Sequence, residues 1–107
     1  MSAYLIVEIK NIRDQEMYAD YRKKAPATLK AYGAKYRARG SRIDVLEGEW
    51  KPDRVVIVEF PSAERAREWY ASEAYQPIKK LRVDSVDSDI VLLDGLTPEE
   101  DREFNGT

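Results

Sequence analysis

Glu59 is the side chain in this sequence whose setting best suits acid–base chemistry. It ends an otherwise apolar strand face, after Val55 and Ile57. A carboxylate buried there without a partner would have a raised pKa, which is how a general acid or base that works near neutral pH is made. The alternative is a structural salt bridge, for which Arg39 and Arg54 are the expected partners.

Tyr4 and Glu8 are the polar exceptions on a second apolar strand face, on either side of Ile6. If the first and third strands are antiparallel neighbours, Tyr4 lies near Glu59. Glu8 then lies toward the other end of the sheet, about four residues away at roughly 3.3 Å each. That spacing argues against a glycosidase-type carboxylate pair within one subunit. We therefore predict Glu59 and Tyr4 as candidate catalytic residues, with an arginine close by.

Four further side chains are candidates for ligand binding. Arg39 could receive a carboxylate or phosphate through two parallel hydrogen bonds, although the preferred interpretation of this residue is a salt-bridge partner of Glu59. Trp50, Trp69 and Tyr75 could line a pocket for a flat organic ligand. More often such residues fix helix-to-sheet packing. Trp50 stands in a loop, where a dimer contact and a pocket rim are equally good interpretations.

The composition excludes several classes of chemistry. The 107 residues include no cysteine and no histidine, so disulfides, thiol nucleophiles, zinc sites built on Cys or His, and imidazole-dependent triads are excluded. We expect no metal and no cofactor. The formal net charge is −2, with bases dispersed among acids, which argues against nucleic-acid and membrane partners. The lack of cysteine is compatible with the cytoplasm, which is the expected location.

The elements that must position these residues follow from periodicity and turn signals. A helix is expected from Asp14 to Gly33, with an apolar stripe and with Pro26 kinking or dividing it. A glycine and a serine at 40 and 41 should interrupt one strand as a bulge. The expected strands are 3–9, 35–39 continued as 43–47, 54–60 and 88–94; a hairpin loop is expected at 48–53, and short helices after Ser62 and Ser72.

The resulting order is β-α-β-β-α-β, the ferredoxin-like α+β sandwich with a four-stranded antiparallel sheet. We expect residues 1–95 to form this single domain. Residues 96–107 are an acidic C-terminal tail. Thr97, Pro98 and Glu100 form a helix-start signal in the tail, but we expect a frayed helix or a disordered end because few apolar residues could anchor it.

Both faces of the expected sheet are largely apolar, whereas an antiparallel sheet with one wet face should show polar residues there. The helices can cover one face. An uncovered apolar face would approach or exceed the few hundred Å² that monomers usually tolerate. A second copy of the chain is the simplest cover, so a homodimer that joins sheet to sheet is expected. The alternative is a monomer with its tail folded under the sheet.

A series of motifs resembles a known family: Tyr18-x-x-Tyr21, Pro26, Tyr32-Gly33, Arg39-Gly40, Leu46 to Trp50, Arg54 to Ser62, Trp69-Tyr70-x-Ser72-x-x-Tyr75 and Leu81-Arg82. The series resembles short bacterial proteins of unknown function, of the domain of unknown function 1330 type, in the dimeric α/β-barrel, ferredoxin-like superfamily. The match runs from about Ala3 to Gly95 and is most specific from Leu46 to Tyr75. Ala34 departs from it, where a second glycine is common.

The resemblance implies two ferredoxin-like subunits joined sheet to sheet, and it supplies no activity. Superfamilies of this architecture include cofactor-independent monooxygenases, dehydratases and ligand-sensing domains, which is an analogy at the level of the fold. Three functions stay open. One is a homodimeric, cofactor-independent enzyme that acts on a small molecule with Glu59 as acid–base group. The second is a non-catalytic ligand-binding or stress-linked accessory protein. The third, a purely structural module, ranks lower.

Overall fold

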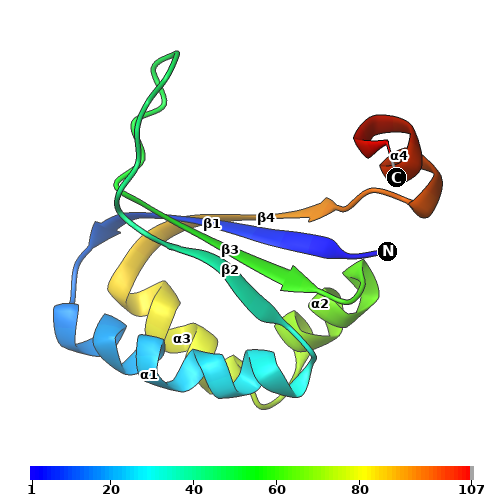
Figure 1. Cartoon of the computed structure of the whole chain (residues 1–107). Helices are drawn as coiled ribbons and strands as arrows, with labels where there is room; N and C mark the ends of the chain where they lie inside the picture. Colours follow the sequence, from blue (N-terminus) through cyan, green and yellow to red (C-terminus); the bar gives the residue numbers. More distant parts are fainter. Residues whose placement is uncertain (107) are drawn as a thin grey trace.

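The chain folds as a ferredoxin-like α+β sandwich (Figure 1). The computed structural model describes residues 1–106. Its four strands form one antiparallel sheet in the order β2-β3-β1-β4, as the sequence predicted. The elements are β1 (Ala3–Ile12), α1 (Gln15–Ala31), β2 (Lys35–Gly40), β3 (Arg54–Phe60), α2 (Ala63–Ala71), α3 (Gln76–Ser85), β4 (Val86–Asp94) and α4 (Pro98–Asn105).

Helix α1 begins and ends where its capping residues predict. The Asp14 carboxylate accepts a hydrogen bond from the Met17 backbone N–H at 3.0 Å. Gly33 follows the helix with a φ of 76°, the left-handed conformation that glycine adopts without steric cost. The helix is continuous through Pro26, so the expected division does not occur. Buried residues on both sides of the proline, including Leu29, hold the two halves against one sheet.

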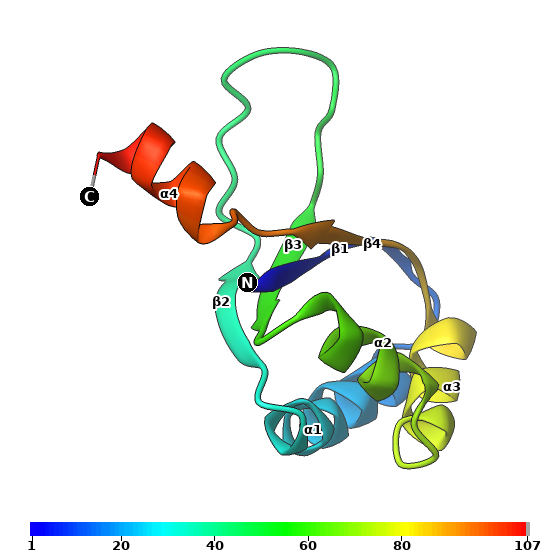
Figure 2. The same cartoon turned by 90° about the vertical axis from the view of Figure 1, so that its right-hand side faces the viewer.

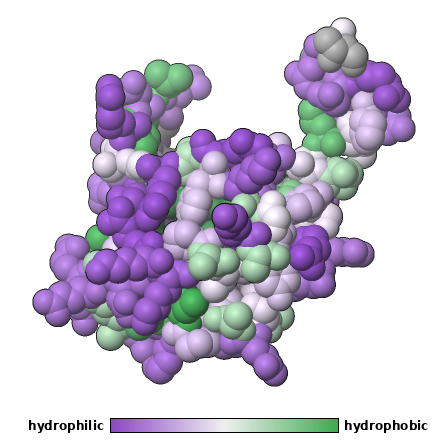
Figure 3. Space-filling model, turned by 60° about the horizontal axis from the view of Figure 1, so that its bottom comes forward, coloured by the Kyte–Doolittle hydropathy of each residue, from purple (hydrophilic) through white to green (hydrophobic). Residues whose placement is uncertain are grey.

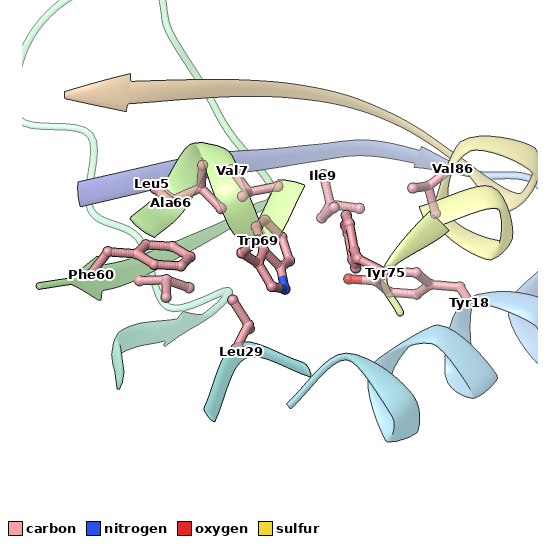
Figure 4. Packing of buried hydrophobic residues seen from close by; sticks show 11 residues of the cluster. Leu5, Val7, Ile9, Tyr18, Leu29, Phe60, Ala66, Trp69, Tyr75 and Val86 are labelled. Carbon is pink, nitrogen blue, oxygen red and sulfur yellow. The ribbon is translucent and has the colours of Figure 1, made fainter. Parts of the chain in front are cut away.

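The core lies between the sheet and the layer formed by α1, α2 and α3 (Figures 1 and 4). Trp69 of α2 is 1% exposed and packs against Phe60 at 5.6 Å between ring centroids. Tyr75 is completely buried beside it, with a ring separation of 4.0 Å. The outer surface of this helical layer is mostly hydrophilic, with scattered apolar side chains (Figure 3). This face of the sheet therefore needs no further cover.

The prediction that the second strand continues through residues 43–47 is wrong. Strand β2 ends at Gly40, and residues 41–53 form a long loop, here called the arm, that projects away from the sheet (Figures 1 and 2). Gly40 lies opposite Val55, almost at the start of β3. Residues beyond Gly40 therefore have no neighbouring strand to pair with, whatever their β-propensity. The bulge also lies elsewhere, between Tyr36 and Ala38.

The other face of the sheet, here called the open face, has no helix packed on it. Its central side chains are Ile6, Ile57 and Val55, and toward β4 it continues with Val91 and Leu93, which are 56% and 57% exposed. The arm and α4 both rise on this side, toward opposite ends of the sheet (Figures 1 and 2). The open face is therefore the apolar floor of a saddle with two raised ends.

The two edge strands carry charges of opposite sign. In β2 the ionisable acidic and basic side chains are Lys35, Arg37 and Arg39, and in β4 they are Asp87, Asp89 and Asp94. Two of the aspartates are paired within the chain, Asp89 with Lys10 and Asp87 with Arg13. These pairs are solvent-exposed and contribute little to stability.

The tail carries the helix start that its sequence indicates. Thr97 and Glu100 form a capping box, in which each side chain accepts a hydrogen bond from the other residue's backbone N–H, at 3.1 and 2.9 Å. No residue of α4 is buried. The expectation for residues 96–107 also includes Thr107, which lies outside the described residues. Among the helices of residues 1–106, none is long and apolar enough to cross a membrane.

Candidate functional site

A cavity of about 50 Å³ lies between α1 and the sheet, and we call it the arginine–tyrosine cavity. On the scale of water-sized groups it has room for a few of them. Strands β1 and β3 give it an apolar ceiling, and α1 closes it from below. Its lining residues are Leu5, Val7, Ile9, Tyr18, Tyr21, Arg22, Ala25, Leu29, Tyr36, Arg39, Val56, Val58, Trp69 and Arg82.

The polar part of this lining consists of arginines and tyrosines, and no acidic side chain lines the cavity. Arg22 and Arg39 are exposed and mark its mouth. Each guanidinium lies over a tyrosine ring, Arg22 over Tyr18 at 5.8 Å and Arg39 over Tyr36 at 5.2 Å. Such cation–π contacts hold the charges near the entrance while leaving their N–H groups free to bind. The cavity is therefore electropositive.

Arg82 is the deepest charge in the site, with 5% of its surface exposed. Its Nη1 donates a hydrogen bond to Ser88 Oγ at 2.8 Å. Its Nε is buried and has no hydrogen-bond partner among residues 1–106. Burial by itself lowers the pKa of Arg82, but the hydroxyls of Tyr75 and Tyr21 raise it by more, so the net shift is upward. The guanidinium is therefore charged at every physiological pH.

The Tyr21 and Tyr75 hydroxyls are joined by a hydrogen bond of 2.8 Å. Burial, and then the neighbouring Tyr75, raise the pKa of Tyr21, so the Tyr21 phenol keeps its proton at neutral pH. The pair has two hydroxyl hydrogens, and only one of them can lie between the two oxygens. The second hydrogen is available for donation to another acceptor.

Trp69 adds an apolar wall to the cavity, beside Tyr75. Its indole N–H donates to Thr28 Oγ1 at 3.0 Å, and the Thr28 hydroxyl donates to the Ala25 carbonyl at 2.8 Å. This chain of bonds fixes the indole plane against α1. Its ring also packs on Tyr75 (Figure 4). The arrangement can position a flat molecule and donate hydrogen bonds to it, but its lining supplies no carboxylate or imidazole to remove a proton.

Three of the four side chains expected to bind a ligand come together here. Arg39 and Trp69 line the cavity, and Tyr75 adjoins it through its bond to Tyr21. Trp50 does not join them. It lies on the arm, 60% exposed, beside a groove that Ile57 also lines on the open face. The cavity and that groove lie on opposite sides of the sheet.

Glu59 and Tyr4 lie directly opposite each other on β3 and β1, at the end of the open face away from Glu8. The Glu59 carboxylate accepts a hydrogen bond from the Ser2 hydroxyl at 2.6 Å and pairs with Arg37 Nε at 2.7 Å. The Ser2 bond, and then Arg37, hold the pKa of Glu59 below its ordinary value. Of the two settings foreseen for this carboxylate, the structure has the salt bridge. The catalytic roles of Glu59 and Tyr4 stay predictions.

The expected salt-bridge partners of Glu59 are wrong. Lys35 lies opposite Glu59, and Arg37 is the extra residue of the bulge between Tyr36 and Ala38; from there its side chain reaches the Glu59 carboxylate. Arg39 lies opposite Val56 and points to the helix-covered side of the sheet. Arg54 lies opposite Ile9, at the far end of β3 from Glu59. A one-residue change of register is enough to exchange one arginine for another.

Sequence reasoning missed Tyr21, Tyr36 and Arg82 as site residues. Tyr21 belongs to the stripe of α1 and was read only as core. Arg82 stands seven residues after Tyr75, which is the spacing of one helix face, so a charge on the buried stripe of α3 was a readable signal. Tyr36 is on the edge strand β2, where the sequence pattern does not show which side of the sheet each side chain faces.

The chain matches the model of a family described as Domain of unknown function (DUF1330) over residues 2–96. No curated protein matches it. Among solved structures, a protein of unknown function from Rhodopseudomonas palustris is similar, with a TM-score of 0.72 at 23% identity, covering 91% of this chain and 84% of that one. A dimeric ferredoxin-like protein of unknown function from Jannaschia has a TM-score of 0.62 at 16% identity, and the match covers 89% of this chain and 100% of that one.

A cofactor-independent oxygenase from Streptomyces nogalater gives a TM-score of 0.59 at 9% identity, covering 90% of this chain and 92% of that one. At identities this low the likeness concerns the fold alone, because one fold hosts many functions.

Proposed function

This chain belongs to the DUF1330 family, and from that premise we propose that it is a homodimeric small-molecule-binding protein. The ligand site is the arginine–tyrosine cavity. The observation that carries the proposal is a set of buried donors without acceptors, Arg82 Nε and the spare hydroxyl hydrogen of the Tyr21–Tyr75 pair, in an otherwise apolar cavity. A few convergent polar groups in an apolar pocket are typical of ligand sites.

The homodimer is supported by the open face. Its apolar floor includes Val91 and Leu93, each more than half exposed. The arm adds Leu46, 94% exposed, and Trp50, 60% exposed, on the same side of the sheet. A second copy related by a two-fold axis would seat its own open face on this floor between arm and α4. Two of the structures with this fold are described as dimeric, which is in keeping with that arrangement.

Binding is favoured over proton transfer in the cavity itself. The sequence has no histidine, the lining has no carboxylate, and the pKa of Tyr21 is raised, so no group there accepts a proton at neutral pH. A ligand held against Arg82 would be oriented and polarised without acid–base help from the lining. An accessory role that captures or delivers a small molecule fits this chemistry.

A second candidate is a cofactor-independent enzyme with Glu59 as its acid–base group and Tyr4 beside it. The register that sets these two residues opposite each other favours it. The lowered pKa keeps the carboxylate ionised at neutral pH, so Glu59 could serve as a base and not as an acid. If a turnover is found, Glu59→Gln should abolish it; unaltered turnover in this variant would remove Glu59 from the mechanism.

The two tryptophans allow a direct test of the cavity. In Trp50→Phe, Trp69 is the sole tryptophan, and its fluorescence reports on the cavity. We expect members of a small-molecule library to change this fluorescence and raise the melting temperature. Ala25→Val, which adds two methyl groups to the lining, should abolish the response. Ala27→Val, on the exposed side of the same helix, should not.

Two outcomes contradict the proposal. In one, no compound of the library changes the Trp69 signal or the melting temperature of the folded protein. In the other, Ala25→Val binds with unchanged affinity, which would place the ligand outside the cavity.

A further inference from the structure

Arg82 stands out in this molecule as a buried charge with no opposite charge beside it. None of the ion pairs within residues 1–106 includes Arg82, Arg22 or Arg39. Its side-chain hydrogen bonds go to neutral hydroxyls, those of Ser88 and Tyr75. A buried charge without a partner is costly, and its hydrogen-bonding groups are costly to leave unpaired. The folded chain carries this cost at a site where a ligand could remove it.

The groups around Arg82 add donors of hydrogen bonds and no negative charge. The Tyr21–Tyr75 pair has a spare hydroxyl hydrogen, and Arg22 and Arg39 bring two more positive charges to the mouth. The chain as a whole has a net charge of −2, so this concentration of positive charge is local. A low-dielectric cavity lined by one sign of charge attracts the opposite sign.

We infer, on the basis of the proposed function, that the ligand of the arginine–tyrosine cavity is a small, flat organic anion whose carboxylate binds Arg82. The planar guanidinium matches a carboxylate by two parallel hydrogen bonds, and its unpartnered Nε is one of the donors. The spare hydrogen of the tyrosine pair binds a carboxylate oxygen as well. The cavity of about 50 Å³ holds the carboxylate beside Trp69, which is fixed by Thr28, and the rest of the ligand extends into the mouth of the cavity.

Arg22 and Arg39 have a different part in this arrangement. Both are exposed, and both rest on aromatic rings instead of on carboxylates. They attract the anion to the mouth, and their long side chains cover it once it is inside. Removing one of them should slow the association of the anion and leave the preference for an anion unchanged. Removing Arg82 should abolish that preference.

The test uses two probes of the same shape, benzoate and benzamide, on the Trp50→Phe protein with Trp69 fluorescence as the readout. The two compounds differ in charge, and only benzoate is an anion at neutral pH. We expect benzoate to bind at least about tenfold more tightly than benzamide, because hydrogen bonds to a charged group are stronger than neutral ones. The preference should weaken as salt is added.

Arg82→Met is the decisive variant. Methionine is long and apolar, so it fills the same space without a buried charge. We expect Arg82→Met to unfold at the same temperature as the parent or higher, since replacing an uncompensated buried charge by a hydrophobic residue removes a desolvation cost. It should lose the preference for benzoate. Arg39→Gln is the control at the mouth: it should retain the preference with a slower association rate.

The outcomes separate this inference from the function on which it rests. If benzoate and benzamide bind equally, or if Arg82→Met keeps the preference, the anion inference is wrong while the binding site stands. If neutral library compounds bind and benzoate and other carboxylates do not, the inference is again wrong. If no compound of any charge binds, both fail. An Arg82→Met protein that is markedly less stable than its parent would mark Arg82 as structural and would also overturn the inference.

Discussion

Ile57→Lys should convert the proposed homodimer into a monomer. Ile57 lies in the middle of the open face, opposite Ile6 on β1 and next to Ala38 on β2. Both sheet neighbours keep their backbone pairing when the side chain changes, because the side chain stands on the solvent side of the sheet. The substitution therefore tests the face without removing a core residue.

The magnitude follows from the two-fold symmetry. Complete burial of an exposed isoleucine side chain is worth about 1.5–3 kcal/mol, but Ile57 is already partly buried in the single chain, so the interface adds about a third of this, roughly 0.5–1 kcal/mol. A symmetric interface contains the residue twice, so the loss of this burial costs about 1–2 kcal/mol and raises the dissociation constant by a factor of roughly 5 to 30. Taking two ammonium groups out of water adds to this loss. A parent dimer that is stable at micromolar concentration should then be dissociated in the variant at the same protein concentrations.

Sedimentation equilibrium over a range of protein concentrations measures the effect. The parent should sediment at twice 12.4 kDa and Ile57→Lys at 12.4 kDa. Ala27→Lys is the matched control, because it places the same charge on the exposed side of α1 and should leave the dimer intact. Circular dichroism verifies that both variants are folded. A monomeric parent, or an Ile57→Lys protein with an unchanged dissociation constant, would refute the assignment of the open face as the interface.

Three further perturbations test the site and the fold, each followed by chemical denaturation at fixed protein concentration. The folded-state pKa of Glu59 is lowered, so its contribution to stability is complete above the ordinary value of 4.5 and is lost as the pH falls through the folded pKa. Glu59→Gln should thus be less stable than the parent at pH 7 and no different at low pH; an equal deficit at both would contradict the pKa shift. A Cβ at Gly95 would lie 2.6 Å from a backbone oxygen, whereas one at Gly40 would meet nothing within 4 Å. Gly95→Ala should therefore be destabilising and Gly40→Ala close to neutral, and similar effects at the two sites would be evidence against the close approach of Gly95 to the Ser2 backbone. Thr28→Val leaves the Trp69 indole N–H buried without its acceptor, at a cost of about 1–3 kcal/mol, and a neutral result would show that this bond does not hold the indole.

The fold was readable from the sequence wherever a local signal and a tertiary requirement agreed. Asp14 and Gly33 set the ends of α1, and the branched residues of β3 set that strand to its exact bounds. Residues 43–47 have a strand-like composition and are not a strand. These residues have no neighbouring strand to pair with, because β3 begins only at Arg54. The absence of a partner depends on the whole sheet and cannot be inferred from residues 43–47 alone.

The site was readable in part. Trp69 and Arg39 were identified by residue type, and they do line one cavity. The partner of Glu59 was not readable, because it depends on a bulge of one residue at Arg37. The position of Arg82 on the buried stripe of α3 was readable from the seven-residue spacing to Tyr75, but its part in the site was not, because the spacing does not show what surrounds the guanidinium. Its lack of a carboxylate neighbour emerges only when the whole fold is assembled.

The single sign of charge on each edge strand has a consequence for the chain before it is assembled. An unpaired edge is a template for intermolecular sheet growth, and charged side chains are the usual protection. Here β2 against β2 brings bases together and β4 against β4 brings acids together, so either contact repels. The attractive contact is β2 of one copy with β4 of another. If the proposed homodimer brings β2 of one copy beside β4 of the other, its two-fold axis repeats that contact on both sides, so both kinds of edge are covered and further growth of the sheet is disfavoured.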